Sequence, residues 1–266
     1  MSRKLALAAA LAAALPAHAL VAVNSATFTY AQNFDTLASS GSATWANDST
    51  LVGWHLFRQP APGTAITAYA VNDGASNAGS FYSYGIASSS ERALGGLGSG
   101  GTYFGSPGNP AVAGWIAAGF TNTSGATLLQ ATIAFDGEQW RNGGNTTAHT
   151  MVFEYGFGGS FTSVTSWIAP GTNFDWTSPV ATATAAAVDG NVAGKVANRG
   201  GTLNLDWNSG DTLWLRWVET NNVGNDHGLA IDNFNIAVSA VPEPASALLL
   251  AGGALLLGAN ARRRRG

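Results

Sequence analysis

The sequence predicts an all-β protein, a two-sheet β-sandwich of jelly-roll type. Short runs in which every second residue is apolar recur along the chain, as in strands with one buried face. Turns rich in Asn, Asp and Gly separate these runs. Charged residues make up only 10% of the 266 residues. Outside the two termini, no stretch of three helical turns is amphipathic, so we expect about ten short strands.

The alternation assigns side chains to faces within several strands. Leu129, Ile133 and Phe135 are predicted to share a face. Leu213, Leu215 and Trp217 are predicted on one face of a later strand, with Trp214 and Arg216 on the other. The ten predicted strands cover residues 28–35, 52–57, 66–71, 81–86, 112–121, 126–135, 151–157, 202–207, 213–217 and 228–238. Turns are expected at residues 72–74, 142–144, 189–191 and 208–210.

The last predicted strand contains a break in its apolar alternation. Leu229 and Ile231 alternate, but the next apolar series starts at Phe234. One extra residue restores the phase, so a β-bulge is predicted at Asp232 and Asn233. A strand that passes from one environment to another is the alternative.

The N-terminus predicts export. Arg3 and Lys4 precede an apolar helix over residues 5–15, and Ala17 and Ala19 form an A-x-A cleavage site. This pattern is that of a signal peptide cut by signal peptidase. We therefore expect three parts: a signal peptide (1–19), a β-sandwich ectodomain (20–240) and a C-terminal tail (241–266).

The tail has three parts of distinct chemistry. The first part is Val241 to Pro244, in which Pro242 and Pro244 disfavour helix and push Val241 and Glu243 towards extended backbone. An apolar run follows over residues 245–260, long enough for a short helix but short for a full membrane span. The tail then closes on a basic cluster that would remain on the cytoplasmic side: Arg262, Arg263, Arg264 and Arg265.

This tail resembles the PEP-CTERM sorting signal of exported proteins in Gram-negative bacteria. The resemblance implies recognition by exosortase, transient anchoring in the inner membrane through the C-terminal helix, and an association with exopolysaccharide and biofilm. It also implies cleavage near Pro242 and Pro244. An ordinary C-terminal anchor with a proline-rich stem is the alternative, which changes the processing but not the location.

Blocks within the ectodomain look like those of exported PEP-CTERM proteins of unassigned function. The last block is also similar to the closing strand of jelly-roll carbohydrate-binding modules, in which an acidic or amide residue often helps to hold calcium. The blocks cover residues 32–37, 90–95, 137–144, 211–217 and 225–234. The resemblance implies no activity.

The charge and cysteine content exclude some classes of protein. The whole chain has a formal net charge of −3, but residues 20–240 carry fourteen acidic and six scattered basic side chains. A nucleic-acid partner would need a basic patch. There is no cysteine, so disulfides do not stabilise the domain.

Glu138, Trp140 and Arg141 follow a well-formed strand and suggest a ligand-binding surface, where a tryptophan stacks on a sugar ring. The other interpretation, which we favour, is that Trp140 packs at the rim of the sandwich and Glu138 pairs with an arginine such as Arg92 or Arg216. The full set of candidate ligand-binding residues is Glu138, Trp140, Arg141, Trp214, Arg216 and His227.

Oxygen ligands for a structural calcium are expected near the closing strand. Asn225, Asp226 and Asp232, with Asp35 from the first strand, can supply amide and carboxylate oxygens. First and last strands are often neighbours in jelly rolls, which favours this grouping. Ordinary turn and strand-end hydrogen bonding is the alternative.

These observations favour an exported, non-catalytic envelope or biofilm-matrix protein that binds extracellular polysaccharide. One alternative is a polysaccharide hydrolase or lyase that uses Glu138 and Asp226 as acid and base. The other is a purely structural adhesin. The chain contains no nucleophile elbow and no paired carboxylates close in sequence, so catalysis is not expected.

Overall fold

The computed structural model describes residues 20–240. The predicted signal helix, its cleavage site and the sorting tail lie outside this range. Within it, no helix is long and apolar enough to cross a membrane. The same range holds no α-helix and two short 3-10 helices, η1 (Thr102–Phe104) and η2 (Phe161–Ser163).

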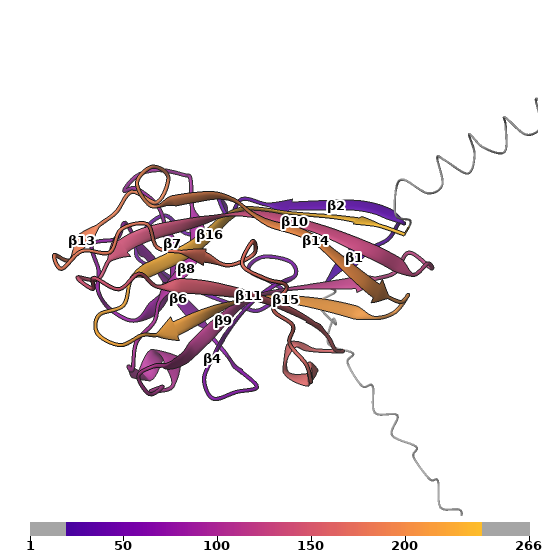
Figure 1. Cartoon of the computed structure of the whole chain (residues 1–266), viewed down its shortest axis with the longest axis horizontal. Coiled ribbons are helices and arrows are strands. Elements are labelled where there is room, and N and C mark those ends of the chain that lie inside the picture. The colour runs from indigo at the N-terminus through magenta and orange to yellow at the C-terminus, as the bar shows by residue number, and fades with distance from the viewer. Residues whose placement is uncertain (1–19, 241–266) are drawn as a thin grey trace, which may run out of the picture.

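Two β-sheets stacked face to face form the domain (Figure 1). The seven-stranded sheet runs β12-β11-β15-β9-β4-β5, with β1 beside β9. Its strands are β1 (Val21–Val23), β4 (Trp54–Arg58), β5 (Thr64–Ala65), β9 (Ala111–Asn122), β11 (Thr150–Phe157), β12 (Trp176–Thr177) and β15 (Thr212–Asn221).

The nine-stranded sheet runs β13-β10-β16-β8-β7-β6-β3, with β14 beside β10 and β2 beside β16. Its strands are β2 (Thr27–Gln32), β3 (Ser42–Thr44), β6 (Ala68–Asn72), β7 (Ser80–Tyr84), β8 (Ala93–Leu97), β10 (Leu128–Asn142), β13 (Ala186–Ala187), β14 (Lys195–Trp207) and β16 (Gly228–Ser239). The predicted all-β, two-sheet architecture is therefore confirmed.

The main core lies between the sheets and is built around stacked aromatic rings. Trp217 of β15 packs on Trp54 of β4, with ring centroids 5.7 Å apart, and Phe234 of β16 meets both rings edge-on. The inward residues of each strand alternate with residues on its outer face, as the period of two requires. Each sheet also has a smaller apolar cluster on its outer face.

All ten predicted strands are present, with ends shifted by a few residues. The face of Leu129 was predicted wrongly: Leu128 is buried in the core and Leu129 is half-buried. A register shift between Leu128 and Gln130 explains the difference, because it changes which residue points inward.

The predicted bulge on the closing strand is also present. Asp232 pairs with Asp136 and Asn235 pairs with Ala134, so two residues of β16 oppose one of β10. Asn233 has a φ of 51°, the left-handed conformation that Asn tolerates better than most residues. The bulge lies where β16 exchanges β8 for β2 as its neighbour.

Candidate functional site

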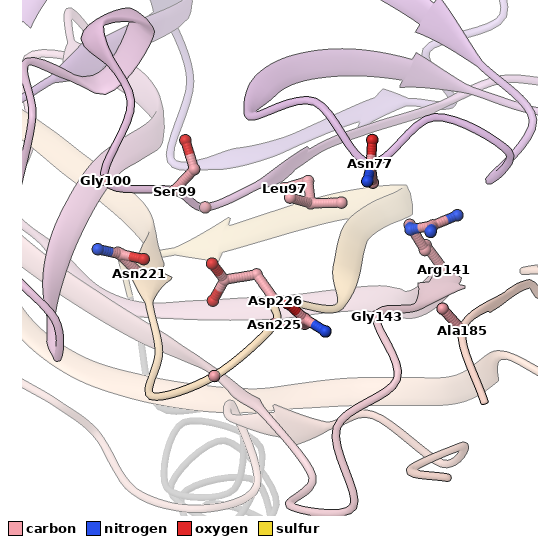
Figure 2. A pocket seen from close by; sticks show the side chains of 12 residues that line it. Asn77, Leu97, Ser99, Gly100, Arg141, Gly143, Ala185, Asn221, Asn225 and Asp226 are labelled. Atoms are coloured by element: carbon pink, nitrogen blue, oxygen red, sulfur yellow. The ribbon is translucent and has the colours of Figure 1, made fainter. Parts of the chain in front are cut away.

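A polar pocket of about 340 Å³ lies at the end of the sandwich where β8, β10 and β15 end and β16 begins. Figure 2 shows the carboxylate of Asp226 between Asn221 on one side and Arg141 on the other. Residues from five separate segments line it: Asn77, Leu97, Gly98, Ser99, Gly100, Arg141, Gly143, Ala185, Asn221, Gly224, Asn225 and Asp226. Its volume is within the usual range for small-molecule sites.

Asp226 is the acidic group of this pocket. The backbone N–H of Asn222 donates to Asp226 Oδ1 over 2.7 Å, which closes the short turn between β15 and β16. Burial raises the pKa of Asp226 to about 7, although the hydrogen bonds from Asn222 partly oppose this rise. The carboxyl therefore exchanges its proton near neutral pH.

A second carboxyl, that of Glu219 on β15, lies beneath the pocket wall. Glu219 Oε1 accepts a hydrogen bond of 2.8 Å from the backbone N–H of Gly98, and Oε2 is buried without a partner. Burial, followed by the charge of Asp226, raises the pKa of Glu219 well above its ordinary value. The neutral form of Glu219 is therefore favoured.

Arg141 brings a guanidinium to the opposite wall. Its Nη1 donates to the carbonyl oxygens of Gly74 and Ala75, over 2.9 and 3.0 Å. These bonds tie the end of β10 to the turn after β6. Arg141 Nε is buried without a partner.

Two stacked histidines lie next to the segment that carries Asp226. The rings of His149 and His227 have centroids 4.3 Å apart. The backbone N–H of His227 donates to His149 Nδ1, and His227 Nδ1 lies 2.9 Å from Ser178 Oγ. Burial lowers the pKa of both histidines, that of His149 to about 4. Both rings are therefore neutral at pH 7, and they position the segment that carries Asp226.

The chemistry of the pocket suits a ligand with many hydroxyl groups. Three asparagine amides, a serine hydroxyl, one carboxyl and one guanidinium converge on it. These groups can donate and accept hydrogen bonds in several directions. The lining residues include no aromatic ring, so recognition there would depend on hydrogen bonds rather than on stacking.

The predicted ligand-binding residues divide among three places. Arg141 lines the pocket and His227 supports it. Trp140 is only 1% exposed and packs parallel to Tyr84 at 6.1 Å, so it packs in the outer cluster of the nine-stranded sheet. Trp214 and Arg216 lie on the other sheet, where Arg216 pairs with Glu154.

The proposed pairing of Glu138 with an arginine is wrong. Arg92 donates to Ser83 through Nε and Nη2, and the side chain of Arg216 is held by Glu154. Glu138 instead accepts a hydrogen bond from Trp140 Nε1 over 3.0 Å. Glu138 and Asp226 also do not face a common cavity, because Glu138 is not among the residues that line the pocket.

The calcium ligands predicted from the sequence are not brought together. Asp226 lines the pocket, whereas Asp232 lies within β16. The strand from Gly228 to Asp232 alone spans about 13 Å at 3.3 Å per residue, too far for a shared ion. The charge of Asp35 contributes to raising the pKa of Asp232, so the two residues are near each other. The Asp35 carboxylate, however, accepts hydrogen bonds from the Arg92 backbone N–H and from Asn33 Nδ2.

Asp232 instead lies beside Glu91 and Glu138. One ligand oxygen from each of these three residues lies within 4.8 Å of the others. Burial, together with the neighbouring acidic charges, raises the pKa of Glu138 to about 8 and that of Asp232 to about 7. This acidic cluster lies on the outer face of the nine-stranded sheet.

Sequence reasoning missed Glu219, Glu91 and two of the three pocket amides, those of Asn77 and Asn221. Glu219 continues the inward series Leu213, Leu215 and Trp217. An acid in an apolar series of this kind is itself a sign of a buried carboxyl, which could have identified it. Asn77 and Asn221 carry no such sign, because amides are common in loops.

The comparisons with known proteins concern the tail and the fold. Residues 240–265 match the PEP-CTERM protein-sorting motif. The exported character that the tail predicts is therefore supported by a family model. No curated protein matches the sequence. Among solved structures, the CBM22-1 xylan-binding domain of Paenibacillus barcinonensis Xyn10C is similar at a TM-score of 0.34 and 10% identity, covering 77% of this chain and 100% of that domain.

Proposed function

We propose that this chain, an exported protein with a PEP-CTERM sorting tail and a β-sandwich ectodomain, is a non-catalytic component of the cell envelope or biofilm matrix that binds extracellular polysaccharide. The observation that carries the proposal is the convergence of Asn77, Asn225, Asp226 and Arg141 on one pocket at the end of the sandwich. Exosortase is the expected processing partner, because the motif at residues 240–265 is its recognition signal in the family.

Binding rather than turnover is supported by the environment of the pocket acids. Asp226 is the one acid that lines the pocket, and Glu219 is shielded behind Gly98. Glycoside hydrolysis needs two carboxyls that both face the substrate, about 5–5.5 or 6.5–9.5 Å apart. In this pocket one carboxyl and several amides face the ligand. Such a set is suited to binding and orienting hydroxyl groups, and it lacks the second carboxyl that hydrolysis needs.

The test is saturable binding of the purified protein to a panel of polysaccharides that includes the exopolysaccharide of the producing organism. The double variant Asn77→Ala and Asn225→Ala should bind about five- to 150-fold more weakly, since each lost hydrogen bond contributes about 0.5–1.5 kcal/mol. Asn173→Ala, an exposed amide outside the pocket, is the matched control and should bind as the parent does.

Three results would contradict the proposal in different ways. Absence of saturable binding to any polysaccharide would favour the structural adhesin. Unchanged binding by the double variant would place the site elsewhere on the domain. Reducing ends that increase steadily with time, and are lost in Asp226→Asn, would establish a hydrolase.

A further inference from the structure

Three carboxyl groups converge on the outer face of the nine-stranded sheet from segments far apart in the sequence. Glu138 comes from β10 and Asp232 from the bulge of β16, while Glu91 comes from the segment before β8. One oxygen from each lies within 4.8 Å of the other two. These strands are neighbours in the sheet, so the fold itself holds the three groups together.

Each of the three carboxyls has one buried oxygen without a hydrogen-bond partner. These atoms are Glu91 Oε1, Glu138 Oε1 and Asp232 Oδ1. Glu138 is 0% exposed and Asp232 is 3% exposed, so water does not freely satisfy them. A buried carboxylate without a partner is costly, and three such atoms at one place indicate a ligand that the protein chain itself does not supply.

The second oxygens of the two glutamates are held in place by donors. Trp140 Nε1 donates to Glu138 Oε2 over 3.0 Å, and Asn191 Nδ2 donates to Glu91 Oε2 over 2.6 Å. Hydrogen bonds of this kind orient carboxylates for a ligand, as outer-shell partners do at metal centres.

No basic side chain in residues 20–240 forms an ion pair with the cluster. Lys195 pairs with Asp136 at 2.8 Å, and Arg216 pairs with Glu154 on the other sheet. Arg92 lies near Glu91, but its Nε and Nη2 donate to Ser83. Within residues 20–240 no cation is therefore ion-paired with the cluster, although the charges of Lys195 and Arg92 act on it from nearby.

The turn at residues 189–194 covers the cluster. Gly190 lies so close to the Trp140 indole that a Cβ on it would be 2.4 Å from the ring, and Gly194 O accepts a hydrogen bond from the Gln139 backbone. Asn191 from this turn donates to Glu91. The cover fixes the carboxyls and limits access of water.

We propose that Glu91, Glu138 and Asp232 bind a divalent cation with all-oxygen coordination, with calcium as the preferred ion. Calcium takes oxygen ligands at 2.3–2.6 Å, so oxygens on opposite sides of it are about 4.6–5.2 Å apart, which the spacing of the cluster accommodates. Zinc and other softer metals favour nitrogen and sulfur ligands, and the protein has no cysteine. Water or backbone oxygens complete the coordination.

The bound ion joins three segments that no covalent link connects. It pins the segment before β8 and the bulge of β16 to β10. The site is distinct from the polar pocket, whose lining includes none of the three carboxyls. The test of the cation site is therefore independent of the test for polysaccharide binding.

The first measurement is thermal unfolding of chelator-treated, dialysed full-length protein with and without calcium chloride. At a hundredfold excess over the Kd, binding to the folded state should raise the Tm by about 5–10 °C. Calorimetric titration should give one calcium per chain. No Tm shift and no binding heat with calcium, magnesium or manganese would overturn the proposal and leave the carboxyls as proton-sharing groups.

Substitutions locate the ion. Glu138→Gln and Glu91→Gln should each weaken calcium binding at least about a hundredfold, and both should remain folded because they reduce repulsion in the metal-free state. Glu154→Gln, which removes a carboxylate on the other sheet, and Asp226→Asn at the pocket should keep the calcium-dependent shift. An undiminished shift in Glu138→Gln would overturn the assignment.

Terbium luminescence tests for a bound ion directly, because carboxyls with a purely structural role would give no sensitised emission. Tb³⁺ replaces calcium at oxygen sites and is excited by a nearby indole. Trp140 contacts Glu138 directly, so Trp140→Phe should reduce the sensitised emission while Tb³⁺ still binds. Equal emission from the parent and from Trp140→Phe would place the ion away from the cluster.

Discussion

Trp140 and Glu138 lie two residues apart on β10, and the indole Nε1 of Trp140 donates to Glu138 Oε2 over 3.0 Å. Both side chains are buried on the outer face of the nine-stranded sheet. One local hydrogen bond therefore connects an apolar cluster, which includes Tyr84 and Leu97, to an acidic one.

Trp140→Phe should destabilise the domain because it removes this donor and leaves Glu138 Oε2 buried without a partner. An unsatisfied buried group costs about 1–3 kcal/mol, which corresponds to a Tm lower by about 2–12 °C for a domain of this size. Thermal unfolding measures the change. Tyr155→Phe, at a half-buried ring, should shift the Tm by less; an equal shift would mean that the hydrogen bond contributes little.

Gly137→Ala should also lower stability, through steric overlap. A Cβ at Gly137 would lie 2.3 Å from Cδ2 of the buried Trp176 indole, so a core ring would have to move. Overpacking of this kind costs about 1–3 kcal/mol. The matched control is Gly108→Ala, where nothing lies within 4 Å of the added Cβ. Urea unfolding with equal midpoints for both variants would contradict the packing described for β10.

Asp226→Asn should change how stability depends on pH. The folded-state pKa of Asp226 is about 7, against 3.8 ordinarily. Between pH 4 and 7 the unfolded chain releases this proton while the folded chain keeps it, so the parent loses stability as pH rises through that window. The variant lacks this loss. Its stability relative to the parent should increase by about 2–4 kcal/mol from pH 4 to pH 8.

Denaturant unfolding at several pH values measures that difference. Asp206→Asn, at an exposed acid on β14, controls for the change in net charge. A difference between Asp226→Asn and the parent that stays constant from pH 4 to pH 8 would contradict the burial assigned to Asp226.

Processing of the tail should be visible as a loss of mass. We expect the mature protein from exosortase-containing cells to end near Pro242 and Pro244, whereas protein from cells without exosortase should still end in Gly266. Alanine substitution of Pro242, Glu243 and Pro244 together should prevent the cut. Intact-mass spectrometry reads both results, and a mature species that retains Arg265 and Gly266 in the presence of exosortase would refute cleavage.

The sequence predicted the longer strands well because alternation identifies a strand with one buried face. It missed β8, whose residues Ala93–Leu97 are all buried and include Gly95 and Gly96. With both faces covered there is no alternation to detect. The glycines are needed because neighbouring backbone is close: a Cβ at Gly95 would lie 2.2 Å from Leu229 O.

The bulge was predictable because it leaves a trace in the order of apolar residues. The acidic cluster and the pocket leave no such trace. Glu91 and Glu138 are 47 positions apart, and they meet only because β8 and β10 both flank β16. The packed interpretation of Trp140 agrees with its burial, but the sequence could not show what covers it, because the covering turn comes from residues 189–194.

The position of β16 has a consequence for the order of assembly. It is the last strand of the domain in the sequence, yet it lies inside the nine-stranded sheet. One edge of β16 pairs with β10, and the other edge pairs first with β8 and, after the bulge, with β2. The sheet cannot close until residues 228–239 have been delivered, immediately before the sorting motif begins at residue 240. Folding of this sheet therefore cannot finish before β16 is available, and a chain interrupted before β16 would leave the edges of β10, β8 and β2 unpaired and prone to aggregation.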